Sequence, residues 1–288
     1  MRIMECELRT AALVAAGALV LSLALPPGAA RAQQPYVMKI STPTVHDIPD
    51  TWAARLAAAL EKDSGGRIKA QVYPASQLGS IPRQIEGTQF GSIQMEVVPP
   101  EFMVGLDPRF EVMAAPGLVD SQSHGQRVSF ERLGITPVAM TLGDVLPAIQ
   151  QGTIDGAVTG IGPVANFHMV HAAKFAPQTG QPAIFLIAEV NRKWFDALPK
   201  DLQQTIERDA KAQSVAIDPL AVEQVKQSEA SFTSGGGELI TLPPGEHAAM
   251  MKTIDSVAPD VSSKSPQLAA AYSIVADAAA RTRQTPGQ

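Results

Sequence analysis

Few side chains in this sequence have types and spacings that could carry chemistry. His168 and His171 stand three residues apart; on a helix they would share a face and could bind a metal ion. No third ligand stands nearby, so ordinary surface or capping histidines are favoured. The run Gly235-Gly236-Gly237 could surround an anion through its backbone N–H groups, but no lysine, serine or threonine follows at the spacing of a phosphate-binding loop. A flexible connector is the favoured interpretation of that run.

Catalytic motifs are missing from the sequence as well. It contains no G-x-S-x-G, no H-E-x-x-H and no G-x-G-x-x-G. Glu101, Asp107 and Glu111 are too dispersed to indicate a pair of catalytic carboxylates. The sequence therefore predicts a binding protein rather than an enzyme, with no cofactor and no metal.

The N-terminus is typical of an exported protein. An apolar run over residues 11–25 is followed by Ala30-Arg31-Ala32, which has the small-x-small pattern of a signal-peptidase site. We therefore expect a signal peptide over residues 1–32 and a periplasmic location. The only cysteine, Cys6, lies in this leader, so the exported chain would have no disulfide. Acidic side chains outnumber basic ones by 28 to 23 without a basic stripe, which gives nucleic-acid binding little support.

Strand and helix patterns alternate in the first half of the exported chain. Residues 36–40, 67–73 and 93–98 have the composition of strands. Helical periodicity predicts one helix that begins at residue 49 and a second helix over about 82–90. Strand–helix–strand order with short connections favours a parallel, doubly wound sheet.

The second half repeats this order. Residues 136–140 and 154–158 look like strands, with a helix over 143–151 between them. The segments 89–94 and 150–155 each place a glycine at the end of a helix, where a left-handed cap is needed. Two such units predict two similar lobes, although many α/β domains share this pattern. Further along we expect a helix from Leu198, a strand over 238–241, and helices near 246–257 and 266–281.

Ligands of open α/β sheets bind beyond the carboxyl ends of the strands, which places the candidate cleft in three segments. These are residues 41–47, 99–102 and 159–163. His46 is the most notable polar residue among them. It could contact a ligand, or it could cap the helix that follows.

Four ordered motifs give the chain a family resemblance. The segment IKAQVYPASQLG at residues 68–79 resembles a signature of the solute-binding subunits of tripartite ATP-independent periplasmic (TRAP) transporters. The segments at residues 84–94, 148–156 and 194–203 agree with the same family in order and spacing. The resemblance implies a two-lobed α/β receptor with a hinge between the lobes. It also implies a small organic acid as ligand, commonly a dicarboxylate, and TRAP-type membrane permease subunits as partners.

Two departures from the family affect the expected site. After the helix ending near Arg127 and Val128 the family continues for several dozen residues, which include the arginine that clamps the ligand carboxylate. Here Ser129 follows directly and begins what resembles the later part of the family. We therefore expect that the second lobe is shortened between Val128 and Ser129. If this segment is instead aligned to the family without such a gap, Arg127 would be the substitute for the family's arginine. Thr159 stands where the family commonly has an asparagine that touches the ligand.

The sequence thus predicts a periplasmic receptor that delivers an organic acid to a permease. Expected boundaries are residues 33–125 plus about 186–225 for the first lobe, and 126–185 plus about 226–288 for the second. The predicted cleft residues are His46, Pro100, Glu101, Arg127, Thr159, Gly160 and Gln181. Two alternatives stay open: a ligand-independent interaction module or degenerate receptor, and an exported enzyme on the same scaffold.

Overall fold

The computed structural model describes residues 34–107, 109–110, 131–138, 140–179, 186–263 and 265–283. The predicted site residues Arg127 and Gln181 lie outside these ranges, as does the predicted signal peptide. Within the described part of the chain, no helix is both long enough and apolar enough to cross a membrane.

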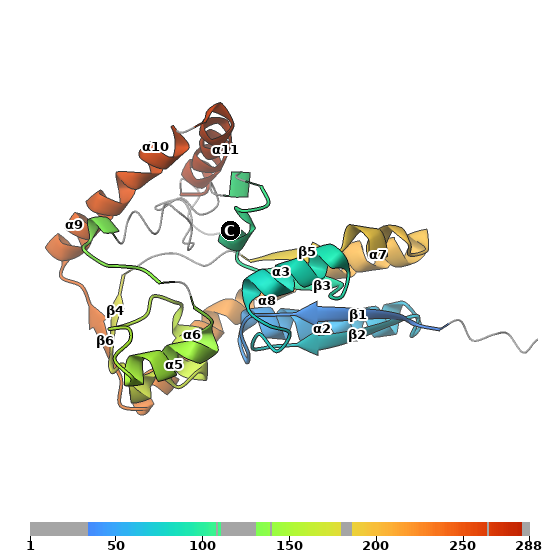
Figure 1. The fold of residues 1–288 in the computed structure, drawn as a ribbon, viewed down its shortest axis with the longest axis horizontal. Helices are drawn as coiled ribbons and strands as arrows, with labels where there is room; N and C mark the ends of the chain where they lie inside the picture. The colour runs from blue at the N-terminus through green and yellow to red at the C-terminus, as the bar shows by residue number, and fades with distance from the viewer. Residues whose placement is uncertain are drawn as a thin grey trace, which may run out of the picture. The chain divides into compact units, whose positions relative to one another are not determined.

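A four-stranded sheet forms the centre of the first part of the fold (Figure 1). Its strands lie in the order β2 (Ile68–Tyr73), β1 (Tyr36–Ser41), β3 (Met95–Val98) and β5 (Ile187–Val190). β1 is parallel to both β2 and β3, as predicted, but β5 is antiparallel to β3. The predicted parallel arrangement is therefore confirmed for β1, β2 and β3, whereas the unpredicted β5 is antiparallel because it returns from a distant part of the chain rather than through a strand–helix–strand crossover.

Helices α2 (Ile48–Asp63) and α8 (Lys200–Ser234) pack against each other and cover one face of this sheet. α2 begins at Asp47, whose side chain accepts a hydrogen bond from the Asp50 backbone N–H and so satisfies an unpaired donor of the first turn. The apolar positions recur at helical spacing and face the strands. The largest fully buried members of this core are Met38, Ile40, Leu56, Leu60, Ile68, Met95 and Leu202.

The opposite face of the sheet carries helix α3 (Ile81–Phe90). Its Ile85 packs with Val98 of β3 and with Met103 of the 3-10 turn η1 (Pro100–Met103) in a second, smaller apolar cluster. Gly91 ends α3 in the left-handed conformation, with φ of 86°. Gly152 has φ of 67° just after α5 (Leu142–Gln150). The prediction of a left-handed glycine at each of these helix ends is confirmed.

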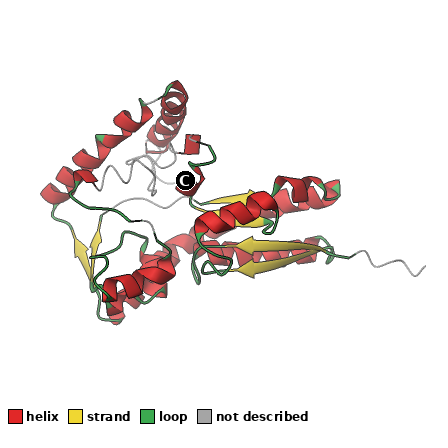
Figure 2. Ribbon diagram, in the orientation of Figure 1, coloured by secondary structure: helices red, strands yellow, loops and turns green. Residues whose placement is uncertain are grey.

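The second half of the chain contains much less sheet. β4 (Phe175–Gln178) pairs in parallel with β6 (Glu238–Thr241), and these two strands form a separate sheet, seen as a second group of arrows in Figure 2. The strands predicted at residues 136–140 and 154–158 are absent among the described residues of those segments. A strand needs a neighbour for its backbone N–H and C=O groups, and no described segment pairs with these two. Sequence reasoning in turn missed β4 and β5, which are only four residues long.

Short helices complete the described chain. The helices predicted near 246–257 and 266–281 are found within a few residues of those bounds. The remaining elements are α6 (Ile161–Asn166), η3 (Met169–His171), α7 (Arg192–Asp196), α9 (Pro244–Asp255), α10 (Val257–Ser262) and α11 (Pro266–Arg283).

Candidate functional site

The loop that follows β1 is held by side chains from two helices of the second half. Asn166, at the end of α6, donates its Nδ2 hydrogens to the carbonyl oxygens of Val45 at 2.8 Å and His46 at 3.1 Å. Gln224 of α8 donates from Nε2 to the same His46 oxygen at 2.8 Å. Three amide hydrogen bonds therefore fix the backbone of a loop that emerges at the carboxyl end of the sheet.

His46 itself adopts the left-handed backbone conformation, with φ of 57°. Its backbone N–H donates to Oδ2 of Asp50 at 2.8 Å, while its side chain is exposed. The following residue, Asp47, is the N-cap of α2, so the cap role considered for His46 belongs to Asp47.

A polar pocket of about 190 Å³ opens beside this turn. The lining residues come from the β1 loop, α6 and α8, and are His46, Ala165, Asn166, Gln224, Gln227, Ser228 and Ser231. Amide and hydroxyl groups dominate the lining, and His46 is its one titratable residue. Such a lining can hydrogen-bond a small polar ligand.

Asp47 lies next to this pocket and is almost fully buried, with 6% of its surface exposed. Burial raises the pKa of its carboxyl group to about 6, although the hydrogen bond from the Asp50 N–H opposes the rise. A Cβ atom placed on Gly162 of α6 would lie 3.9 Å from Cβ of Asp47 and 3.9 Å from Oγ of Ser228. Gly162 therefore allows the loop and both helices to approach closely.

The other predicted residues are placed as follows. Gly160 is the N-cap of α6, and the half-buried Thr159 directly precedes it, so both stand on the segment that leads into the helix carrying Asn166. Pro100 is buried at the start of η1, just after β3. Because β1 and β3 are parallel neighbours, the loops after them leave the sheet at the same edge. Glu101 lies on η1, and its side chain is outside the described part of the structure.

The structure joins the loop that contains His46 to the segment that begins at Thr159 and Gly160 through residues that sequence reasoning missed. Asn166 is 121 residues from its partner Val45 in the sequence. Gln224 is 178 residues from its partner His46. No local pattern marks a side chain that bonds to such a distant backbone. Asp47 carried a usable signal, because aspartate directly before a helical pattern is a preferred N-cap.

The paired histidines do not form the helical motif considered from the sequence. His168 has a left-handed backbone, with φ of 54°, and precedes the 3-10 turn η3. The two exposed rings lie 6.0 Å apart between centroids. Among the described residues, no group of three or more His, Cys, Asp or Glu side chains could hold a metal ion.

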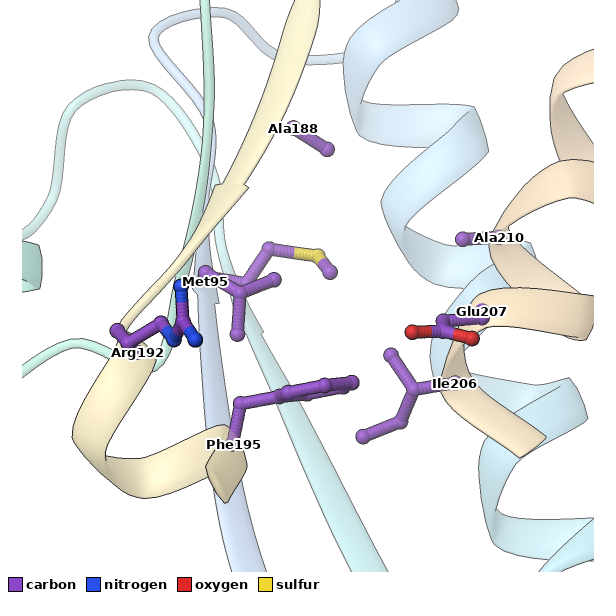
Figure 3. Close-up of a pocket in the computed structure, with 8 residues that line it drawn as sticks. Met95, Ala188, Arg192, Phe195, Ile206, Glu207 and Ala210 are labelled. Carbon is purple, nitrogen blue, oxygen red and sulfur yellow. The ribbon is translucent and has the colours of Figure 1, made fainter. Parts of the chain in front are cut away.

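A second pocket, of about 230 Å³, has a different character. It lies between β5, α7 and α8 and is lined mainly by apolar side chains; Figure 3 shows Phe195 and Ile206 close together, with Arg192 and Glu207 on opposite sides. Arg192 Nε already donates to Asp196 at 2.8 Å. None of the predicted site residues that the structure describes lines this pocket, so the polar pocket beside His46 is the better candidate for the functional site.

Comparisons with known proteins agree with the fold. A family model described as "Bacterial extracellular solute-binding protein, family 7" matches residues 44–132 and 123–264. The C4-dicarboxylate-binding periplasmic protein DctP of Rhodobacter capsulatus is 24% identical over 307 residues, which covers 85% of this chain and 91% of that protein.

Solved structures of TRAP periplasmic solute-binding proteins share the fold at low sequence identity. One, from Anaerococcus prevotii with bound glucuronate, is 16% identical with a TM-score of 0.77, covering 84% of this chain and 97% of that chain. Another, from Pseudomonas aeruginosa with bound L-malate, is 15% identical with a TM-score of 0.74, covering 78% of this chain and all of that one.

Proposed function

Because the chain belongs to bacterial extracellular solute-binding protein family 7, we propose that it binds a small organic acid in the periplasm and delivers it to a TRAP-type membrane permease. The observation that carries the proposal is the match to this family over residues 44–264, which spans the elements from the loop after β1 to α10. The resemblance to TRAP receptors noted in the sequence is thereby confirmed, as is a two-lobed α/β fold.

The ligand class follows from what the relatives bind. Glucuronate, L-malate and C4-dicarboxylates differ in size and shape but share a carboxylate. In this chain the pocket beside His46 offers amide and hydroxyl groups suited to the polar part of such an acid. A carboxylate also needs a cation, and a bidentate arginine suits it best.

Arg127 is the arginine proposed for this role. Arg132, a described arginine close to it in sequence, already donates to Ser256 Oγ and pairs with Asp260. Thr159, Gly160, Pro100, Glu101 and Gln181 complete the proposed lining.

The proposed lobes keep the boundaries expected from the sequence. Residues 33–125 with about 186–225 would form the first lobe, and this grouping is supported by the strands of the four-stranded sheet. Residues 126–185 with about 226–288 would form the second, supported by the pairing of β4 with β6. Residues 1–32 would be removed on export.

A shortened second lobe is also part of the proposal. The family model matches in two pieces that meet at residues 123–132, close to the expected join. The alignment to the Rhodobacter protein spans 307 positions, more than the 288 residues of this chain, so it includes positions that have no counterpart here. Both observations support the loss of an internal stretch near residues 128–129.

The test is thermal unfolding of the purified protein against malate, other mono- and dicarboxylates, glucuronate and galacturonate. A ligand at a hundred times its Kd should stabilise the fold by about 2.7 kcal/mol, which raises the Tm by several degrees. Arg127→Ala should abolish that rise. Arg83→Ala is the matched control, because the Arg83 guanidinium is exposed on α3 and pairs only with the neighbouring Glu86.

Each contrary outcome has a clear meaning. A cooperative transition that no acid moves would contradict the receptor function and favour a ligand-independent interaction module. An acid effect that survives Arg127→Ala would leave the receptor function standing and remove Arg127 from the site. Turnover of any acid, with or without added metal, would favour the exported enzyme instead.

A further inference from the structure

Two glutamates face each other inside the first sheet. Glu96 of β3 stands directly opposite Glu189 of β5 in the antiparallel register. Side chains alternate along a strand, and Met95 and Val97 face the core formed with α2 and α8. Glu96 therefore points to the other face, where Val98 packs with Ile85 of α3 and with Ile187 of β5.

Glu96 is fully buried, and Glu189 beside it is partly buried. Glu96 has no exposed surface, and within the described structure both of its carboxyl oxygens, and Oε1 of Glu189, have no donor. Ser41 stands beside Glu96 in the β1–β3 register and is also fully buried with an unpartnered hydroxyl. Gln84 and Thr88, on the buried side of α3, each have one unpartnered oxygen as well.

The described residues of β1 and α3 supply no opposite charge to the pair. Along β1, the charged residue on the same face is Lys39, two positions before Ser41 and level with Gln94 rather than Glu96 in the register. On α3, Arg83 and Glu86 are exposed and pair with each other at 3.4 Å. A buried pair of acids without a cation can be accommodated only if at least one of them keeps its proton.

The pKa values of the two groups agree with this geometry. Burial, the charge of Glu189 and a hydrogen bond to Glu189 together raise the pKa of Glu96 to about 9. Burial also raises the pKa of Glu189, while the hydrogen bond from Glu96 opposes that rise. At neutral pH, Glu96 therefore keeps its proton opposite Glu189 in the strand register.

We propose that Glu96 and Glu189 share one proton that stabilises the pairing of β5 with β3. The strength of this pairing therefore depends on pH. Among the described strands, β5 lies at the edge of its sheet and pairs with β3 alone. It is also where the chain returns to this sheet after β4, which belongs to the other sheet. Loss of the proton places two negative charges side by side where β5 pairs with β3.

The direction of the pH effect follows from the two states of the chain. The unfolded chain releases the proton of Glu96 near the ordinary glutamate pKa of about 4.3, whereas the folded chain keeps it until about pH 9. The contribution to stability is therefore complete below the unfolded value and is lost as pH rises to 9. Within that window, each pH unit raises the unfolding equilibrium constant about tenfold.

Urea unfolding of the whole purified protein between pH 5 and pH 9 tests this proposal. Above pH 7, where Asp47 is already ionised, the wild-type protein should lose stability with the slope of one proton. Glu96→Gln keeps the shape of the side chain and removes its charge, so it should flatten the slope and stabilise the protein most at pH 9. Glu86→Gln, on the exposed side of α3, should keep the wild-type slope. A wild-type slope that persists in both Glu96→Gln and Glu189→Gln would overturn the proposal.

A spectroscopic measurement keeps the test independent of folding yield. The infrared spectrum of the folded wild-type protein at pH 7 should contain the band of a protonated carboxyl group, and Glu96→Gln should remove it. Absence of that band in the wild-type protein would also overturn the shared proton. So would added Ca²⁺ that abolishes the wild-type slope, because the two carboxylates would then be holding a cation. None of these readouts uses an organic acid, so they stand apart from the proposed function.

Discussion

The two sheets of this protein differ in how completely the chain around them buries its apolar side chains. Around the first sheet, Met38, Ile40, Leu56 and Leu60 have no exposed surface. In the second half, Ile135 is 46% exposed and Val138, Val158 and Phe175 are more than half exposed. The first sheet has two helical layers and four strands, whereas β4 and β6 form the second sheet alone.

This difference shows that secondary structure and burial depend on partners more than on composition. Residues 154–158 have β-branched side chains and a helix before them, much as β3 does, yet only β3 has strands on both sides. An apolar segment without a neighbouring strand has unpaired backbone groups and cannot persist as a lone strand. A lost internal stretch would have this effect, because it removes partners while leaving the segments that needed them.

The largest expected effect compares two positions on the same helix, α8. Leu202→Ala removes a fully buried side chain from the first core and should cost about 2–5 kcal/mol in the free energy of unfolding. Val222→Ala, at a position that is 62% exposed in the other half of the helix, should be close to neutral. Urea unfolding of both variants measures the difference between their free energies of unfolding. Equal losses of stability would mean that the half of α8 around Val222 is covered in solution.

A second variant tests whether the side chain of Phe232 is tightly packed in the second half of the chain. A Cβ on Gly237 would lie 2.4 Å from Cε1 of Phe232, a side chain that is 1% exposed. Gly237→Ala should therefore cost about 1–3 kcal/mol, because the buried ring has to move. Gly245→Ala is the control, since a Cβ there meets nothing within 4 Å. If the two variants unfold at the same urea concentration, the packing around Phe232 is loose.

Asp47 tests the contact between the β1 loop and the second half of the chain. Its folded pKa of about 6 lies above the unfolded value, so its contribution is present at low pH and is lost as pH rises through 6. Asp47→Asn keeps an N-cap side chain and removes the buried charge, so it should stabilise the protein by roughly 1–2 kcal/mol at pH 7 and have little effect near pH 4. Asp155→Asn, on an exposed turn, should show no such pH dependence. Destabilisation at pH 7 would indicate that the loop needs the Asp47 charge.

The smallest effect on stability is expected at the exposed apolar positions. Phe175→Ser should leave the unfolding midpoint almost unchanged, because 66% of the phenylalanine is already exposed. It should nevertheless reduce self-association at high concentration, since exposed apolar surface favours contacts between molecules. Light scattering of the wild-type and variant proteins measures this. A large loss of stability would show that Phe175 is buried by a part of the chain outside the described residues.

The sequence predicted the elements whose signals are local. The periodicity of Trp52, Leu56 and Leu60 marked α2, and alternation marked β2. β5 escaped prediction because Glu189 occupies an inward-facing position, where a charged residue argues against a buried strand. For the candidate site, the rule that ligands bind beyond strand ends indicated His46 and the segment at Thr159, and their role stays a prediction. Asn166 and Gln224 could not be predicted, because their bonds to the β1 loop join residues far apart in sequence.

Helix α8 has a mechanical consequence for such a receptor. It has 35 residues and is therefore about 52 Å long, and it packs against α2 of the first part and α6 of the second. Pro219 lies near its middle and has no N–H to donate to the carbonyl of Val215, whose side chain is exposed to water. The rod is therefore softest against bending at Pro219. A rotation of one half of the protein relative to the other would therefore bend α8 at Pro219 before it bends elsewhere.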